Sequence, residues 1–113
     1  MECLFCRIVQ RQLPAEIVAE DHDVVAFKDV NPQAPTHLLI VSKTHIAKLS
    51  ELTDTTAQIM ASAMMVANRL AKQHGIAETG YRLVINCGPQ AGQSVGHLHL
   101  HLLGGRSMRW PPG

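Results

Sequence analysis

The feature that most constrains this chain is one short segment in which histidine and leucine alternate. From residue 96 to residue 103 the sequence reads Gly-His-Leu-His-Leu-His-Leu-Leu. In a β-strand successive side chains point to opposite faces, so this segment presents its leucines to one face and three histidines to the other. The leucine face predicts burial against a helix. Solvated strand faces usually carry threonine, lysine and glutamate, so we interpret His97, His99 and His101 as functional.

The rest of the chain predicts an α+β architecture around that strand. Residues 3–12 predict a short N-terminal helix that Pro14 ends. Four further strands are predicted over residues 16–20, 23–29, 37–42 and 81–87. With the histidine strand they make a roughly five-stranded antiparallel sheet, and we expect residues 1–113 to form a single domain.

One long helix is predicted over residues 55–74. Its apolar residues recur at spacings of three and four: Ala57, Met60, Met64, Ala67 and Ala71. Such spacing is typical of an amphipathic helix that packs one side on a sheet. Thr55 and Gln58 fit a capping box at its start, and Gly75 fits the position just after its end.

Charge and hydropathy narrow the class of protein. The net charge is +1, which gives no support for binding to nucleic acid or to a membrane surface. No apolar run approaches the roughly 20 residues of a membrane span. The N-terminal residues lack the basic-then-apolar order of a signal peptide, so we expect a cytoplasmic protein. Its three cysteines are then expected to be reduced thiols or metal ligands.

Two kinds of chemistry fit the histidine strand by itself. Histidines at positions i and i+2 of a strand can bind one Zn²⁺ ion. Alternatively, one imidazole acts as a nucleophile while its neighbours bind an anion. The polar loop over residues 87–95, which contains two glycines and Ser94, runs into the strand. Such a loop can aim backbone N–H groups at a phosphate, which favours the second interpretation without excluding the first.

Four separate motifs together resemble one known family. They are His-Leu-His-Leu-His-Leu-Leu at 97–103, Gly-Gln-Ser-Val at 92–95, Asp-Val-Asn-Pro-Gln-Ala-Pro-Thr-His at 29–37 and Trp-Pro-Pro-Gly at 110–113. In this order they resemble the histidine-triad (HIT) family, in particular its nucleotide-binding (Hint) branch. The resemblance runs from about residue 3 to the last residue, and it implies a HIT-like fold and a homodimer.

The resemblance also implies an activity. Members of this branch are purine nucleoside phosphoramidases that act on AMP or GMP phosphoramidates such as adenosine 5′-monophosphoramidate. By resemblance, His99 attacks the α-phosphorus, expels the amine and forms a nucleotidyl-histidine intermediate that water hydrolyses. No cofactor is implied for this catalysis.

By the same resemblance, the site residues fall into groups around the nucleotide. His101, His97, His37 and Ser94 assist His99, and the phosphate end also includes Asn86, Gly92 and Gln93. Asp29 is expected to bind the ribose hydroxyls, although it could instead cap a turn. The base pocket is expected to consist of Phe5, Ile8, Leu13, Phe27 and Val30, some of which could be plain core. Trp110 is expected to reach the partner's active site.

A metal site is a separate expectation. Cys3 and Cys6 form a Cys-x-x-Cys motif, which is half of a zinc site. Some histidine-triad proteins complete it with residues that correspond here to His45 and His97, which implies a structural zinc. The alternative is that the two thiols pack as small hydrophobic groups.

Three other functions stay open from the sequence. Another branch of the family hydrolyses dinucleoside polyphosphates with the same triad. A nucleotide-binding regulatory module with incidental catalysis is a second alternative, and a metalloenzyme on an unrelated fold is a third. Ser94 and the Trp-Pro-Pro-Gly ending favour the phosphoramidase.

Overall fold

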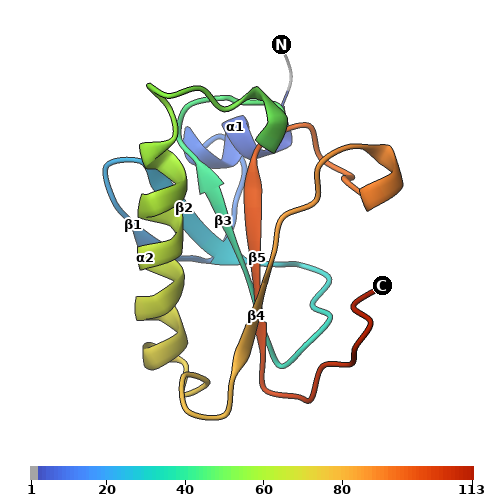
Figure 1. Ribbon diagram of the computed structural model, residues 1–113. Helices are drawn as coiled ribbons and strands as arrows, with labels where there is room; N and C mark the ends of the chain where they lie inside the picture. Colours follow the sequence, from blue (N-terminus) through green and yellow to red (C-terminus); the bar gives the residue numbers. More distant parts are fainter. Residues whose placement is uncertain (1–2) are drawn as a thin grey trace.

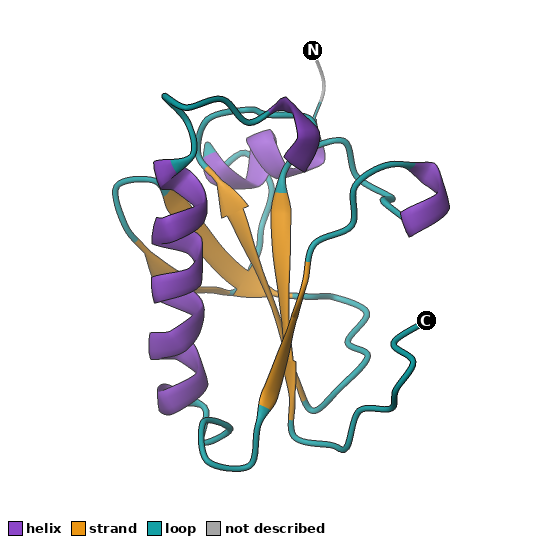
Figure 2. Ribbon diagram, in the orientation of Figure 1, coloured by secondary structure: helices purple, strands orange, loops and turns teal. Residues whose placement is uncertain are grey.

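One five-stranded antiparallel sheet organises the protein (Figures 1 and 2). The computed structural model describes residues 3–113. Its strands are β1 (Ile17–Glu20), β2 (Val24–Lys28), β3 (Thr36–Ser42), β4 (Tyr81–Val84) and β5 (His99–Gly104). Its α-helices are α1 (Leu4–Val9) and α2 (Gln58–Gln73), and two 3₁₀ turns cover Leu49–Glu51 (η1) and Pro89–Ala91 (η2). The predicted fold class is therefore confirmed.

The strand order places the histidine strand inside the sheet. The order is β1-β2-β3-β5-β4, so β5 lies between β3 and β4. His101 stands opposite Leu39 of β3 on one side and Val84 of β4 on the other. Because hydrogen-bond ladders hold β5 from both sides, the face to which each histidine points is determined by the sheet as a whole.

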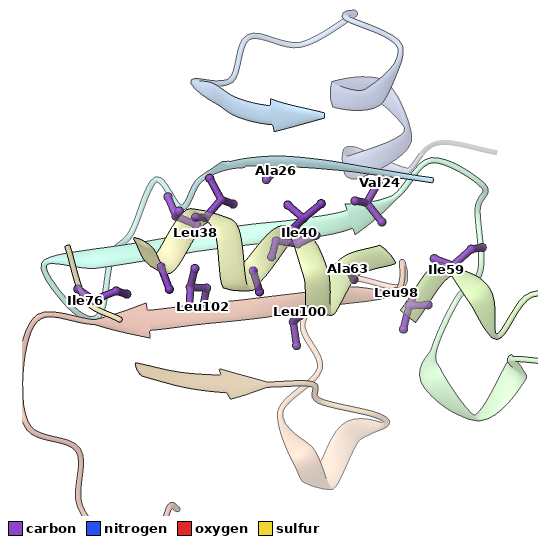
Figure 3. Packing of buried hydrophobic residues seen from close by; sticks show 14 of the residues in the cluster. Val24, Ala26, Leu38, Ile40, Ile59, Ala63, Ile76, Leu98, Leu100 and Leu102 are labelled. Carbon is purple, nitrogen blue, oxygen red and sulfur yellow. The ribbon is translucent and has the colours of Figure 1, made fainter. Parts of the chain in front are cut away.

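The leucine face of this strand packs under α2, as the alternation predicts (Figure 3). Leu98, Leu100 and Leu102 are at most 3% exposed. On the helix side the core is formed by Ile59, Ala63, Val66, Ala67, Leu70 and Ala71. A mixed layer of leucine and β-branched side chains between helix and sheet is the main hydrophobic core.

The predicted helix stripe and capping box are partly wrong. Ala57 is exposed and Met64 is 50% exposed, because α2 turns the stripe of Ile59, Val66 and Leu70 toward the sheet. Spacings of three and four fit more than one helix face, and only packing selects between them. The helix begins at Gln58 without a side-chain cap, since Thr55 contacts Thr53 instead. Gly75 adopts φ +72° after the helix, which confirms its predicted place.

The opposite face of the sheet is covered on one half by α1. Six residues form a second core there: Phe5, Ile8, Val25, Phe27, Leu39 and Val41. The helix ends at Val9, earlier than predicted, because Arg11 turns the chain with φ +63°. Over the β4–β5 half lie the loop after β4 and the C-terminal segment (Figure 1). Neither helix combines the length and hydropathy that a bilayer-crossing segment needs.

The segments around the histidines are less regular than predicted. β4 ends at Val84 instead of Cys87, and β5 begins at His99 instead of Gly96. The backbone of His97 therefore precedes the strand, although its ring still lies on the α1 side, 5.9 Å from the ring of Phe5. The shortened strands leave the loop between them free to bend over the histidine face.

Candidate active site

The orientation of His99 is set by a backbone carbonyl. Its Nδ1 lies 2.6 Å from the carbonyl oxygen of His97. A carbonyl only accepts hydrogen bonds, so Nδ1 carries the proton and Nε2 keeps its lone pair. The ring is 7% exposed and packs edge-on against Phe5 at 5.1 Å. His99 is therefore a rigid imidazole whose Nε2 has the lone pair that a nucleophile needs.

A chain of hydrogen bonds gives His101 the opposite tautomer. The Gln33 N–H donates to His37 Nδ1 at 2.9 Å, so the proton of a neutral His37 is on Nε2. This Nε2 lies 2.9 Å from His101 Nδ1, which therefore accepts. The proton of His101 is then on its own Nε2. Two residues apart on one strand, His99 offers a lone pair and His101 offers an N–H.

Burial keeps these imidazoles neutral. Desolvation, followed by the charges of His99 and His37, lowers the pKa of His101 to about 4, against a small opposing effect of Asp29. Desolvation also lowers the pKa of His37, again opposed by Asp29. Both rings are neutral near pH 7, as the tautomers above require.

We expect the free energy of unfolding to fall as the pH drops from about 6.5 toward 4. In that window the unfolded chain binds a proton at His101 that the folded chain does not, so stability rises with pH there. Urea unfolding at several pH values measures the slope. A His101→Gln variant should show a shallower slope and His22→Gln an unchanged one; equal slopes in all three would contradict the assignment.

A cavity of about 440 Å³ opens beside these two histidines. All five residues predicted for the base pocket line it: Phe5, Ile8, Leu13, Phe27 and Val30. Phe5, Ile8 and Phe27 also belong to the second core, so these three residues serve both as core and as wall of the cavity. The sequence analysis missed Leu39 and Val95, which also line the cavity. The alternation in β3 could have found Leu39, since it shares the face of His37.

Asp29 lies at the wall of the same cavity and already has two contacts. Its Oδ1 accepts from the N–H of Asn31 at 2.9 Å, so the turn-capping role is real. Its Oδ2 lies 3.3 Å from His37 Nε2. The carboxylate therefore supports the His37–His101 chain and still borders the space where a ribose would lie.

The loop before the histidine strand is braced by Gln93. Its amide donates to the carbonyls of Ala47 and Val95, and its Oε1 accepts from the N–H of Gly88. The side chain is thus directed into the loop, and its three hydrogen bonds hold that loop in place. Ser94, next to it, does line the cavity. Gly92 lies outside both cavities at the histidines, and Asn86 borders the second of them, described below.

A second cluster joins the residues predicted for zinc. Four ligand atoms, from Cys3, Cys6, His45 and His97, lie within 4.8 Å of one another. His97 Nδ1 is 3.2 Å from Cys3 Sγ and 3.5 Å from Cys6 Sγ. His97 Nε2 lies 2.7 Å from the Ser42 carbonyl oxygen and so carries the proton. The lone pair of Nδ1 therefore faces the two sulfur atoms.

These four side chains fit a tetrahedral zinc ion. Bond lengths of 2.0–2.3 Å around zinc place neighbouring ligand atoms about 3.3–3.8 Å apart, and the observed separations at His97 are close to that. Burial and the Cys3 thiol raise the pKa of the Cys6 thiol. A divalent cation would reverse this effect, because metal-bound thiols lose their proton. The four side chains therefore have the donor types and the spacing that could hold a metal ion.

The chain resembles known proteins over nearly its whole length. The model of the HIT domain matches residues 10–108. A HIT-like protein of Synechococcus elongatus, described as uncharacterized, is 48% identical over 99% of this chain and 97% of its own. A 14 kDa zinc-binding protein of Zea mays is 47% identical over 97% of this chain and 87% of its own.

Among solved structures, a HIT family hydrolase of Legionella pneumophila is similar in both sequence and shape. The TM-score is 0.96 with 51% identity, and the match covers 99% of this chain and all of that one.

Proposed function

This chain belongs to the HIT domain family, and on that premise we propose that it is a purine nucleoside phosphoramidase. The similarity to a HIT family hydrolase supports hydrolysis, and the family supports a nucleotide substrate. The proposal specifies which bond is hydrolysed, namely the phosphorus–nitrogen bond of a substrate such as adenosine 5′-monophosphoramidate.

One observation carries the proposal. An imidazole whose Nδ1 is held by a backbone carbonyl, leaving Nε2 free, His99, and a neutral imidazole with a free Nε2–H, His101, stand side by side at the wall of an apolar cavity. Their ring centroids are 5.1 Å apart. A tetrahedral phosphoryl group can meet both, since one of its oxygens accepts from His101 while its phosphorus faces His99.

Each step of the proposed reaction has a residue that can carry it out. His99 Nε2 attacks the α-phosphorus, the phosphorus–nitrogen bond to the amine breaks, and a nucleotidyl-histidine forms. His101 donates to the phosphoryl oxygen on which charge accumulates. Ser94 borders the cavity, where its hydroxyl can donate to the departing amine. Water then cleaves the phosphorus–Nε2 bond: its hydroxyl joins phosphorus, and its remaining proton replaces the one that left with the amine through Ser94.

The experiment that tests the function compares leaving groups. Purified protein is given adenosine 5′-monophosphoramidate and a diadenosine polyphosphate, and AMP release is followed. We expect kcat/KM to be larger for the phosphoramidate. Preference for the polyphosphate would move the chain to the other branch of the family. Nucleotide binding without turnover of either substrate would instead support a regulatory module.

Gln93→Ala should lower kcat/KM for the phosphoramidate by about 10- to 100-fold. The three hydrogen bonds of this side chain hold the loop that carries Ser94, so their loss displaces groups that act on the phosphate. Steady-state kinetics measure the effect. Gln90→Ala, an exposed change in the same loop, is the matched control and should stay near the wild-type value. Equal kinetics for both variants would contradict the bracing role.

The Cys/His cluster is proposed to hold a structural zinc. The donor set and its spacing support this, and the maize relative is described as zinc-binding. The cluster joins α1 to the loops around β3 and β5, so an ion there would fasten the wall of the nucleoside cavity. The proposed catalysis needs no cofactor, because His99 supplies the nucleophile itself.

A homodimer is proposed through the free edge of the sheet at β4. Tyr81, Met64 and Met65 are 36%, 50% and 56% exposed, and Tyr81 Oη donates to Asn68, one turn beyond the methionines. The β1 edge instead carries ion pairs such as Arg11–Glu20. An exposed apolar patch beside an unpaired strand is typical of an interface. Trp110, 83% exposed, is proposed to reach the partner's active site.

Met65→Glu should shift the protein toward the monomer, because it places a charge in the proposed interface. Light scattering during gel filtration measures the molar mass, with 12.4 kDa expected for one chain. Gln58→Glu adds the same charge at the exposed start of α2 and should leave the dimer intact. A wild-type mass of one chain would contradict the dimer.

Two broader expectations remain proposals. We propose that residues 1–113 form one HIT domain, which a single cooperative unfolding transition would support; Met1 and Glu2 lie outside the described residues. A cytoplasmic location is also proposed, which cell fractionation tests.

A further inference from the structure

A second cavity lies on the histidine face of the sheet, beyond His101. Its volume is about 510 Å³, and its lining residues come from β3, β4, β5, the loops before β3 and after β4, and the C-terminal segment. Among its lining residues are Arg82, Asn86 and Arg106, together with His37 and His101. Within residues 3–113, His101 alone borders both this cavity and the nucleoside cavity. The imidazole that faces the phosphate thus separates two compartments.

Two guanidinium groups of this cavity have only carbonyl partners. Arg82 donates to the carbonyl of Arg109 at 3.0 Å. Arg106 donates to the carbonyls of Gln33 and Ser107, at 2.9 and 3.1 Å. In the described part of the chain no carboxylate lies within 4.0 Å of either group. Since a guanidinium has five N–H donors, both arginines keep donors and an uncompensated charge.

The nucleoside cavity has a different electrostatic character. Its charged wall residues are Lys28 and Asp29, which have opposite signs, and most of the others are apolar. The second cavity has two positive side chains, Arg82 and Arg106, and neutral imidazoles, because burial lowers the pKa of both His37 and His101. The last described residue, Gly113, also lines it, but its carboxylate is paired with neither arginine. A compartment of this kind favours an oxyanion, which arginine binds with paired N–H donors.

We propose that the second cavity, here called the arginine cavity, binds a carboxylate on the leaving group of the substrate. This inference rests on the proposed function. The nucleoside fills the first cavity and its phosphoryl oxygen accepts from His101, so the part of the substrate beyond phosphorus extends past His101. The preferred substrates are then nucleoside phosphoramidates in which the nitrogen belongs to an amino acid with a free carboxylate. Cleavage of the phosphorus–nitrogen bond releases that amino acid.

Two substrates of equal size test the proposal. One is the adenosine 5′-phosphoramidate of β-alanine, and the other is that of β-alanine amide, which has the same shape without the charge. For the wild-type protein we expect kcat/KM to be about tenfold or more higher for the carboxylate, as charge-assisted hydrogen bonds allow. Raising the salt concentration from about 50 to about 500 mM should reduce this ratio, because the screening length shortens.

Arginine variants locate the effect in the cavity. Arg82→Gln and Arg106→Gln should each bring the ratio of the two kcat/KM values toward one. Arg69→Gln, an exposed change on α2, is the matched control and should keep the wild-type ratio. The salt dependence of the wild-type protein supplies a test that does not depend on how the variants fold.

Each outcome has a distinct meaning. Equal kcat/KM for both substrates in the wild-type protein would overturn the arginine cavity and leave the phosphoramidase standing. A high ratio that persists in both arginine variants would also overturn it. Hydrolysis of neither substrate, nor of the unsubstituted phosphoramidate, would overturn the proposed function and this inference with it.

Discussion

Replacing His99 with alanine should reduce kcat for adenosine 5′-monophosphoramidate by at least about 10⁴-fold. The variant loses His99 Nε2, the one imidazole nitrogen among residues 3–113 that lines this cavity with a lone pair free for attack. The remaining binding contacts cannot replace a nucleophile, so the residual rate should be set by solvent water. AMP release under saturating substrate measures the change.

The intermediate gives this prediction a second readout. Rapid acid quenching of the wild-type reaction should trap a nucleotide on His99, visible as an increased protein mass, and the variant should show none. His74→Ala, an exposed histidine at the end of α2, should behave as the wild type in both measurements. A nucleotide adduct that persists in the His99 variant would place the nucleophile elsewhere, with Ser94 as the next group to replace.

Removing the metal ligands should cost stability and spare most of the activity. We expect one zinc per chain in the purified protein, and little in a Cys3→Ser/Cys6→Ser double variant. Zinc binding stabilises the folded state, and the double variant loses this stabilisation. If free zinc is held near 1,000 times its dissociation constant, the loss is about 4 kcal/mol in the free energy of unfolding. Zinc analysis and urea unfolding, each with and without EDTA, measure the two effects.

The activity should persist because the metal site and the nucleophile use different atoms of His97. The ring faces the cysteines through Nδ1, while the backbone carbonyl holds His99. The His97 ring also stays anchored through Nε2 to the Ser42 carbonyl without the ion. Cys87→Ser, outside the cluster, is the control and should retain zinc. Loss of turnover in proportion to zinc loss would instead restore the metalloenzyme hypothesis.

Local sequence patterns, such as the alternation of side chains in a strand, predicted the fold well. The alternation at residues 97–102 identified which side chains face α2, because a strand has a period of two whatever surrounds it. The strands before it and the long helix also follow from local patterns. The helix face was the main error, since the spacing of Ala57 and Met64 is compatible with a helix but does not say which side meets the sheet.

The resemblance predicted the composition of the site better than its arrangement. The base-pocket residues and the Cys/His cluster do come together. The structure adds what the motifs do not show: Gln93 braces its loop, and Asn86 borders the arginine cavity. A motif indicates which residues lie near a site, whereas the direction of each side chain depends on the residues that pack around it.

The sequence by itself determined that three histidines lie on one face of the sheet and that a leucine face is buried. Only the tertiary structure decided what each histidine can do. The Nδ1 proton of His99 follows from local backbone geometry, but His101 takes its tautomer from His37, 64 positions away, and His97 from Ser42, 55 positions away. The chemistry of an imidazole depends on which of its nitrogens is protonated. The hydrogen-bond donor or acceptor beside the ring decides this, and the fold supplies that partner.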